Sequence, residues 1–234
     1  MNCTGNSISN ICTSCNYHYL EKKENNIIIK CLNIEYDIIF IVDTTGSMSN
    51  YFYEINSIFL NILQELTNNV EIKYYFKYGI VFYKNPVHCN DKENKYIQLT
   101  NNFTEIINYF QSESFSGGCD IEDWIGSYYL ALYNIFWRNG TRLIIHITDG
   151  THSKEGDEET QLGSMIAECT KKNIRILGLY IEGFLGNASY SSFVKYKKVY
   201  DINNGPKFEI MNFLDINNNT QFKSSLEKII YEVN

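Results

Sequence analysis

The chain has 234 residues, a formal net charge of −7 and a hydrophobic fraction of 44%. This length fits one domain of about 200 residues with a short appendage, and the hydrophobic fraction is large enough for a buried core, which excludes general disorder. The longest apolar run, residues 38–42, is far shorter than the ~20 residues of a membrane-spanning helix. The acidic balance and the lack of Lys/Arg clusters argue against nucleic-acid binding, so we expect neither a membrane nor a nucleic-acid partner.

The N-terminal segment, residues 1–34, differs from the rest of the chain because it holds four of the seven cysteines. Cys12 and Cys15 are separated by two residues, a spacing that lets both thiolates reach one tetrahedral Zn²⁺. The segment offers three further ligands: Cys3, His18 and Cys31. The second close cysteine pair of a zinc knuckle is missing. A structural Zn²⁺ site, a redox role and a disordered tail with unpaired thiols are therefore all kept as alternatives.

Charged and polar residues at 21–26 predict a linker, so the globular domain is expected to cover residues 35–234. The N-terminus has neither the basic start nor the apolar stretch of a signal peptide. Together with an odd number of cysteines, 7, this predicts a reducing compartment and hence a cytoplasmic protein.

From residue 36 onward, apolar runs of strand length alternate with segments of helical periodicity. We expect strands over 37–43, 74–83, 143–148, 174–181 and 208–213, and a short edge strand over 96–99. We expect helices over 55–66, 103–110, 120–137, 162–169 and 222–230. This order predicts an α/β fold, doubly wound, with a mostly parallel central sheet, helices on both faces and one short antiparallel edge strand. Ligands of such sheets bind beyond the carboxyl ends of the strands.

Oxygen-bearing side chains gather at those strand ends. Asp43, Thr45 and Ser47 alternate along the loop after the first buried strand, so their side chains can converge. A second loop, with paired glycines that let it pass close to the first, leads to Asp120, and Asp149 follows a central strand. Carboxylates and hydroxyls are ligands of Mg²⁺ or Mn²⁺ rather than of zinc.

With these three loops the globular part of the chain resembles the von Willebrand factor type A domain. The metal-ion-dependent adhesion site of that family has Asp-x-Ser-x-Ser in its first loop, Thr in the second and Asp in the third. Asp43, Thr45 and Ser47 match the first loop, with Thr in place of one Ser, and Asp149 matches the third. Asp120 stands where the family has Thr. The resemblance implies that these residues bind a divalent cation and that an Asp or Glu of a partner protein completes its coordination.

Within the family, the three loops are most similar to those of intracellular members found beside alpha-type protein kinases, although no kinase catalytic segment is present. Three aspartates would leave a site holding a divalent cation at −1. We therefore expect tighter metal binding, and weaker recruitment of an external carboxylate, than at a site with two aspartates. We also expect four positions on the rim that touches the partner: Thr44, Gly118, Thr151 and His152.

Other interpretations remain for these residues. His146 lies in a buried strand and is expected to be a hydrogen-bonded core residue rather than a ligand. A Mg²⁺-dependent phosphohydrolase with Asp43 as nucleophile would need a second aspartate where Thr45 stands, and a lysine beyond the central strands. A third possibility is a structural subunit whose site is empty. We expect a metal-dependent protein-interaction module and not an enzyme.

Overall fold

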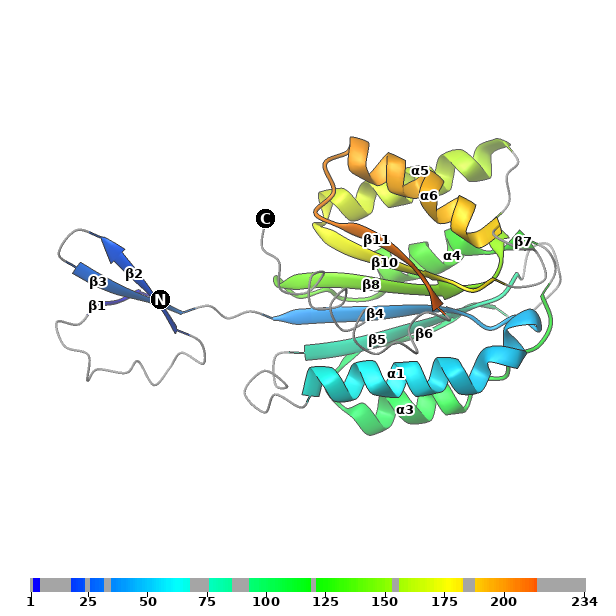
Figure 1. Ribbon diagram of the computed structural model, residues 1–234, viewed down its shortest axis with the longest axis horizontal. Coiled ribbons are helices and arrows are strands. Elements are labelled where there is room, and N and C mark those ends of the chain that lie inside the picture. The colour runs from blue at the N-terminus through cyan, green and yellow to red at the C-terminus, as the bar shows by residue number, and fades with distance from the viewer. Residues whose placement is uncertain are drawn as a thin grey trace.

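The computed structural model of the chain describes residues 2–4, 18–23, 26–31, 35–67, 76–85, 93–118, 121–152, 156–182 and 188–213. The strands in these segments form one sheet of six, one of three and one of two. The six-stranded sheet and the helices that cover it make up the body of the domain (Figure 1).

The six-stranded sheet has the order β11-β10-β8-β4-β5-β6. Its strands are β4 (Tyr36–Asp43), β5 (Phe76–Tyr83), β6 (Lys95–Thr100), β8 (Thr141–Thr148), β10 (Ile174–Tyr180) and β11 (Phe208–Asn212). All neighbouring pairs are parallel except β5 and β6, which are antiparallel. The predicted doubly wound sheet with one antiparallel edge strand is therefore confirmed.

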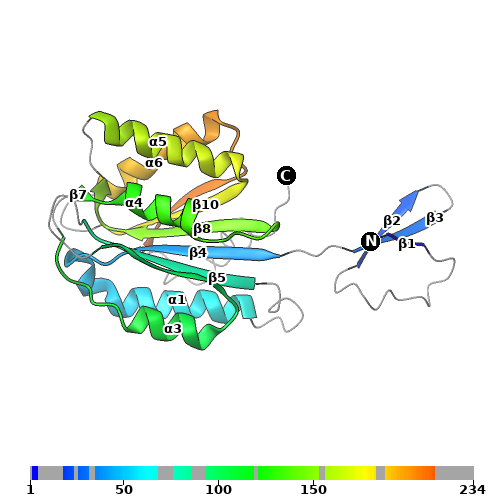
Figure 2. The same cartoon turned by 180° about the vertical axis from the view of Figure 1, so that it is seen from behind.

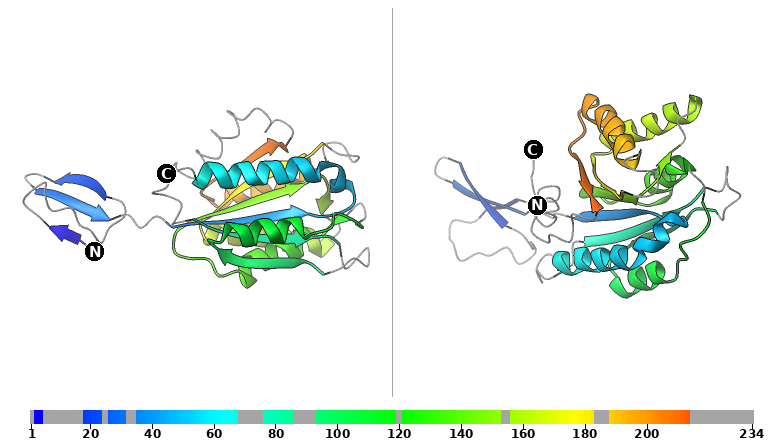
Figure 3. Two further views of the ribbon diagram at one scale, coloured as in Figure 1. Left: turned by 90° about the horizontal axis from the view of Figure 1, so that it is seen from below. Right: turned by 45° about the vertical axis from the view of Figure 1, so that its right-hand side comes forward.

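Helices cover both faces of this sheet. On one face lie α1 (Phe52–Thr67), which continues a 3₁₀ turn η1 (Ser47–Tyr51), and α3 (Phe103–Gln111). The two run side by side beneath the sheet (Figure 3). The other face carries α4 (Trp124–Tyr129), a π-helical turn η3 (Leu130–Asn134), α5 (Gly156–Lys171) and α6 (Ala188–Ile202), as Figure 2 shows. None of the helices in the described part is both long and apolar enough to cross a bilayer.

The apolar run of β4 is continuous because both faces of the strand are buried. Successive side chains of a strand point to opposite faces. Phe40 therefore joins the core beneath α1, where its ring lies 4.7 Å from that of Phe59. Its neighbours Ile39 and Ile41 belong to the core on the opposite face, with Trp124 of α4.

The long helix expected over 120–137 is shorter and changes type. Asp123 caps its start by accepting a hydrogen bond from the amide of Gly126 at 2.8 Å, so α4 begins at Trp124. The helix then passes into the π turn η3, which ends the regular periodicity. Phe136, expected on the buried stripe, lies beyond this turn and is 81% exposed. The structure also adds α6, which was not predicted, whereas the expected helix over 222–230 lies outside the described residues.

Part of the N-terminal segment forms a small antiparallel sheet of order β1-β3-β2. Its strands are β1 (Asn2–Thr4), β2 (His18–Lys23) and β3 (Asn26–Cys31). The charged stretch expected to be a linker therefore contributes residues to β2 and β3 instead. His18 aligns with Cys31 in the backbone register, whereas Cys12 and Cys15 lie outside the described residues. The zinc site and the boundary between this segment and the globular domain stay predictions.

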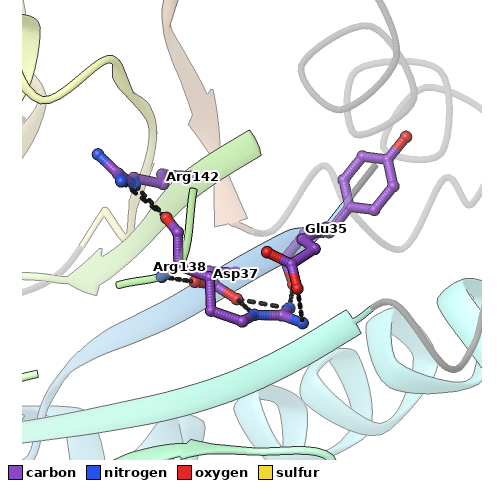
Figure 4. A network of polar contacts seen from close by, with 5 residues as sticks. Glu35, Asp37, Arg138 and Arg142 are labelled. Atoms are coloured by element: carbon purple, nitrogen blue, oxygen red, sulfur yellow. Dashed lines mark hydrogen bonds and ion pairs between the residues drawn. The ribbon is translucent and has the colours of Figure 1, made fainter. Parts of the chain in front are cut away.

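A buried ion pair fixes the amino end of β4 (Figure 4). The carboxylate of Asp37 is completely buried and accepts hydrogen bonds from Nε of Arg138 at 2.7 Å and from the backbone amide of Arg138 at 2.6 Å. The same guanidinium also contacts Glu35 and the carbonyl of Tyr36. Arg142 in turn donates to the carbonyl of Arg138, which ties the start of β8 to this pair.

Candidate metal site

The candidate site lies at the carboxyl edge of the sheet, between two neighbouring strands. Asp43 is the last residue of β4, and Asp149 directly follows β8. The chain places β5 on one side of β4 and β8 on the other, so the strand order reverses at this point. Doubly wound sheets bind ligands at such a switch point. A two-stranded pairing of β7 (Ile121–Glu122) with β9 (Thr151–His152) closes the same end (Figure 1).

Four oxygen-bearing side chains form a continuous row at this edge. Oγ1 of Thr45 donates to Oδ1 of Asp43 at 2.7 Å, and Oγ of Ser47 donates to Oδ1 of Asp149 at 3.0 Å. The two hydroxyl oxygens lie 3.2 Å apart, which joins the two halves of the row. The structure therefore brings together four of the five residues predicted to bind Mg²⁺ or Mn²⁺. Asp120, the fifth, lies outside the described residues.

The orientation of the two hydroxyls matters for what the row can bind. Thr45 and Ser47 each have a carboxylate within reach for their single hydrogen. With both hydrogens directed at carboxylates, the contact between the two hydroxyl oxygens brings lone pairs together. Two carboxylates and two hydroxyls that converge in this way suit a hard divalent cation.

Burial and charge repulsion act on the two carboxylates. Asp43 is completely buried, and this burial, with a smaller contribution from the charge of Asp149, raises the pKa of Asp43 to about 7. Hydrogen bonds from Thr45 and from Oγ1 of Thr148, at 2.9 Å, oppose the shift. Burial also raises the pKa of Asp149, against its hydrogen bond from Ser47. In the metal-free site Asp43 therefore keeps a proton up to a pH of about 7, and a divalent cation would take its place.

This shift sets the pH dependence expected of the metal-free protein. Between pH 3.8 and about 7 the folded state holds a proton on Asp43 that the unfolded state has released. The free energy of unfolding should therefore fall as the pH rises through that window. Thermal unfolding in EDTA at pH 5 and pH 8 measures this, with Asp43→Asn as the control in which this contribution disappears. An equal pH dependence in both proteins would contradict the assignment.

The second loop passes directly against the first. The amide of Gly46 donates to the carbonyl of Gly117 at 2.7 Å, and the amide of Ser116 donates to the carbonyl of Thr44 at 3.1 Å. Gly118 has a φ of +87°, and a Cβ there would lie 2.6 Å from the side chain of Thr45. Both facts require glycine, so the predicted close approach of the two loops is confirmed.

Three of the four rim positions need correction. Thr44 is 1% exposed, and its hydroxyl donates to the carbonyl of Tyr83 at 3.1 Å, so it joins β4 to β5 instead of facing a partner. His152 is 2% exposed, and its ring hydrogen-bonds to the hydroxyl of Tyr196 on α6. Thr151 is also buried, which leaves Gly118 as the rim position that reaches the surface. The ring of His152 packs against those of Trp124 and Tyr196, so it points into the core and away from the rim.

Sequence reasoning missed Lys84, which lies buried at the end of β5 beside the second loop. Its place directly after a predicted strand was the available signal. His146, by contrast, is a core residue as expected: it is completely buried, and Nε2 lies 2.9 Å from the hydroxyl of Tyr83. Burial lowers the pKa of His146 to about 3, so the ring is neutral.

Comparison with known proteins adds evidence on the fold. No protein-family model and no curated protein sequence matches the chain. Among solved structures, the SpRpn10 VWA domain matches with a TM-score of 0.54 and 13% identity, covering 76% of this chain and 88% of that domain. The chain has the von Willebrand factor type A fold. At this identity the match shows the fold alone.

Two larger proteins contain a region with the same fold. The pilus adhesin SpaC from Lactobacillus rhamnosus GG, in its open conformation, matches with a TM-score of 0.60 and 14% identity. The alignment covers 91% of this chain but 33% of SpaC, so the chain spans about a third of that adhesin. Proximal thread matrix protein 1 from the mussel byssus matches with a TM-score of 0.54 and 13% identity, over 82% of this chain and 46% of that protein. At these identities both matches again show the fold alone.

Proposed function

We propose that the domain binds a protein partner through Mg²⁺ or Mn²⁺ held by Asp43, Thr45, Ser47 and Asp149. The observation that carries this proposal is the row of four oxygens across the ends of two neighbouring strands, with both carboxylates buried. Hydroxyl and carboxylate oxygens are the ligands that these cations prefer. Asp120, two residues beyond Gly118, is proposed as a further ligand.

The cation would supply the positive charge to which the partner binds. Two aspartates and one divalent cation are close to neutral together, and an acidic side chain of the partner could then become a ligand. A third aspartate would leave the site at −1. This charge supports tighter metal binding and a weaker attraction for the carboxylate of the partner.

Calorimetric titration of EDTA-treated protein with Mg²⁺ and Mn²⁺ tests the proposal. We expect saturable binding of one ion per chain and release of a proton near pH 6, because the pKa of Asp43 is raised to about 7. The control is Asp201→Asn, which alters an exposed aspartate paired with Lys197 on α6 and should bind the metal as the wild type does. If the wild type shows neither binding heat nor a metal-dependent rise in melting temperature, the proposed metal site is refuted.

The arrangement gives little support to a phosphohydrolase. Lys84 is the lysine closest in sequence to the carboxyl end of a central strand, but its ammonium is bound by the carbonyls of Ser114 and Ser116. It is therefore not presented to a substrate phosphate. Thr45 occupies the position at which that mechanism needs a second acid, and its hydroxyl donates to Asp43.

Two finer assignments belong to the same proposal. The similarity of the three loops to domains found beside alpha-type protein kinases supports membership of that subgroup. The odd number of cysteines, 7, together with the free, buried thiol of Cys169, supports a reducing and hence cytoplasmic location.

A further inference from the structure

Lys84 is a buried lysine whose ammonium group binds the second loop. The residue follows β5 and is 7% exposed. Its Nζ lies 3.0 Å from the carbonyl oxygen of Ser114, 2.6 Å from that of Ser116 and 3.2 Å from the hydroxyl of Ser116. An ammonium has three hydrogens to donate, and a buried charge needs such partners to offset its loss of hydration. These contacts therefore attach the backbone of the loop to a residue that lies 30 to 32 positions earlier in the sequence.

The same stretch of loop is also bound to the first loop. Ser116 contacts Lys84 through its carbonyl and donates its amide to the carbonyl of Thr44. The next residue, Gly117, accepts the amide of Gly46. Gly46 lies between Thr45 and Ser47, the two hydroxyl ligands of the proposed site. A displacement of the second loop would therefore remove support from the backbone that orients both hydroxyls.

We propose that Lys84 is a positioning residue that holds the second loop against the first loop in the metal-free protein. The metal site is then preformed, and a cation binds without rearrangement of these loops. A preformed site binds its ligand more tightly, because the free energy of binding is not reduced by the cost of ordering the loops. The expected effect of Lys84 on metal affinity rests on the proposed function. Its contacts with the second loop do not, because they exist in the metal-free protein.

The experiment compares Lys84→Met with Lys95→Met by amide hydrogen exchange in EDTA. Lys95 is the matched control, because its exposed ammonium pairs with Glu113 of the same loop at 2.7 Å. In Lys84→Met we expect the amides of Ser116 and Gly46 to exchange at least about tenfold faster, while the amides of β4 and β8 keep their protection. Lys95→Met should exchange as the wild type does. Unchanged exchange at Ser116 and Gly46, or faster exchange throughout the core strands, would overturn the proposal.

Mn²⁺ titration of the same proteins tests the effect on the metal. We expect the affinity of Lys84→Met to fall by about tenfold, as is typical of residues that orient metal ligands, and that of Lys95→Met to stay unchanged. If the loop amides lose protection and the Mn²⁺ affinity does not change, the preformed site is refuted. If the wild type binds no Mn²⁺, the proposed function fails, while the exchange result still decides the role of Lys84. Should Lys84→Met not fold, Lys84→Gln, which keeps an NH₂ donor but loses the charge, takes its place: the same two amides should exchange faster than in the wild type, and unchanged exchange would overturn the proposal.

Discussion

Replacing Asp43 by asparagine is expected to abolish binding of Mg²⁺ and Mn²⁺ while leaving the fold intact. The carboxylate accepts hydrogen bonds from Thr45 and from Thr148, and an asparagine retains one oxygen for Thr45. The hydroxyl of Thr148 can rotate to accept a hydrogen bond from the new NH₂ group. The charge that attracts the cation is lost, however. Because loss of an outer-shell residue already costs about 10–100-fold in metal affinity, loss of a ligand should exceed about 100-fold.

Two measurements separate a lost ligand from a damaged fold. In EDTA at pH 8, Asp43→Asn should melt at a higher temperature than the wild type, because the variant buries no charge beside Asp149. Ser47→Ala removes an uncharged ligand, so it should weaken metal binding less than Asp43→Asn, which removes a charged one. Metal affinity of Asp43→Asn within about threefold of the wild type would show that Asp43 is not a ligand.

Replacing Arg138 by methionine is expected to produce the largest loss of stability. The change leaves the carboxylate of Asp37 completely buried without its guanidinium partner. Removing one partner of a buried ion pair costs about 3–5 kcal/mol in free energy of unfolding. Urea unfolding of the two proteins at pH 7 measures this loss.

A double variant identifies the cause of that loss. Asp37→Asn combined with Arg138→Met should be more stable than Arg138→Met alone, because no unpaired charge stays buried. Arg142→Met should cost less than Arg138→Met, since Arg142 donates to the carbonyls of Arg138 and Lys172 and not to a buried carboxylate. If the double variant is no more stable than the single one, packing and not charge accounts for the role of Arg138.

The central part of the fold could be predicted because burial on both faces leaves a simple pattern. Strands β4 and β8 are marked in the sequence by mostly apolar runs, and the Asp, Thr and Ser residues at their carboxyl ends interrupt that pattern. Since parallel strands end at one edge, Asp43 and Asp149 could be brought together from sequence although they are far apart in the chain. The glycines of the second loop also had a clear local meaning, which the positive φ of Gly118 bears out.

Features that depend on contacts between distant segments could not be predicted in this way. The ammonium of Lys84 binds a loop about thirty residues away in the sequence, and His152 packs against Trp124 and Tyr196, which come from two other segments of the chain. The π turn that exposes Phe136 likewise follows no simple pattern. Helix α6 was different, because Phe193, Tyr196 and Tyr200 recur at helical spacing and are buried. The polar and charged residues between these aromatic side chains obscured the helical periodicity in the sequence.

Strand β4 carries a completely buried aspartate near each end, and the two differ in the origin of their counterion. Asp37 has a guanidinium of the same chain at 2.6 Å, a partner whose charge does not change with solution conditions. Asp43 is surrounded by hydroxyls and an amide, and on our proposal its counterion comes from the solvent. The charge of Asp37, at the amino end of β4, is therefore neutralised as soon as the chain folds. On our proposal, the charge of Asp43, at the carboxyl end, is neutralised only when a divalent cation is bound. Partner binding would then depend on the concentration of free divalent ions and could change without any modification of the protein.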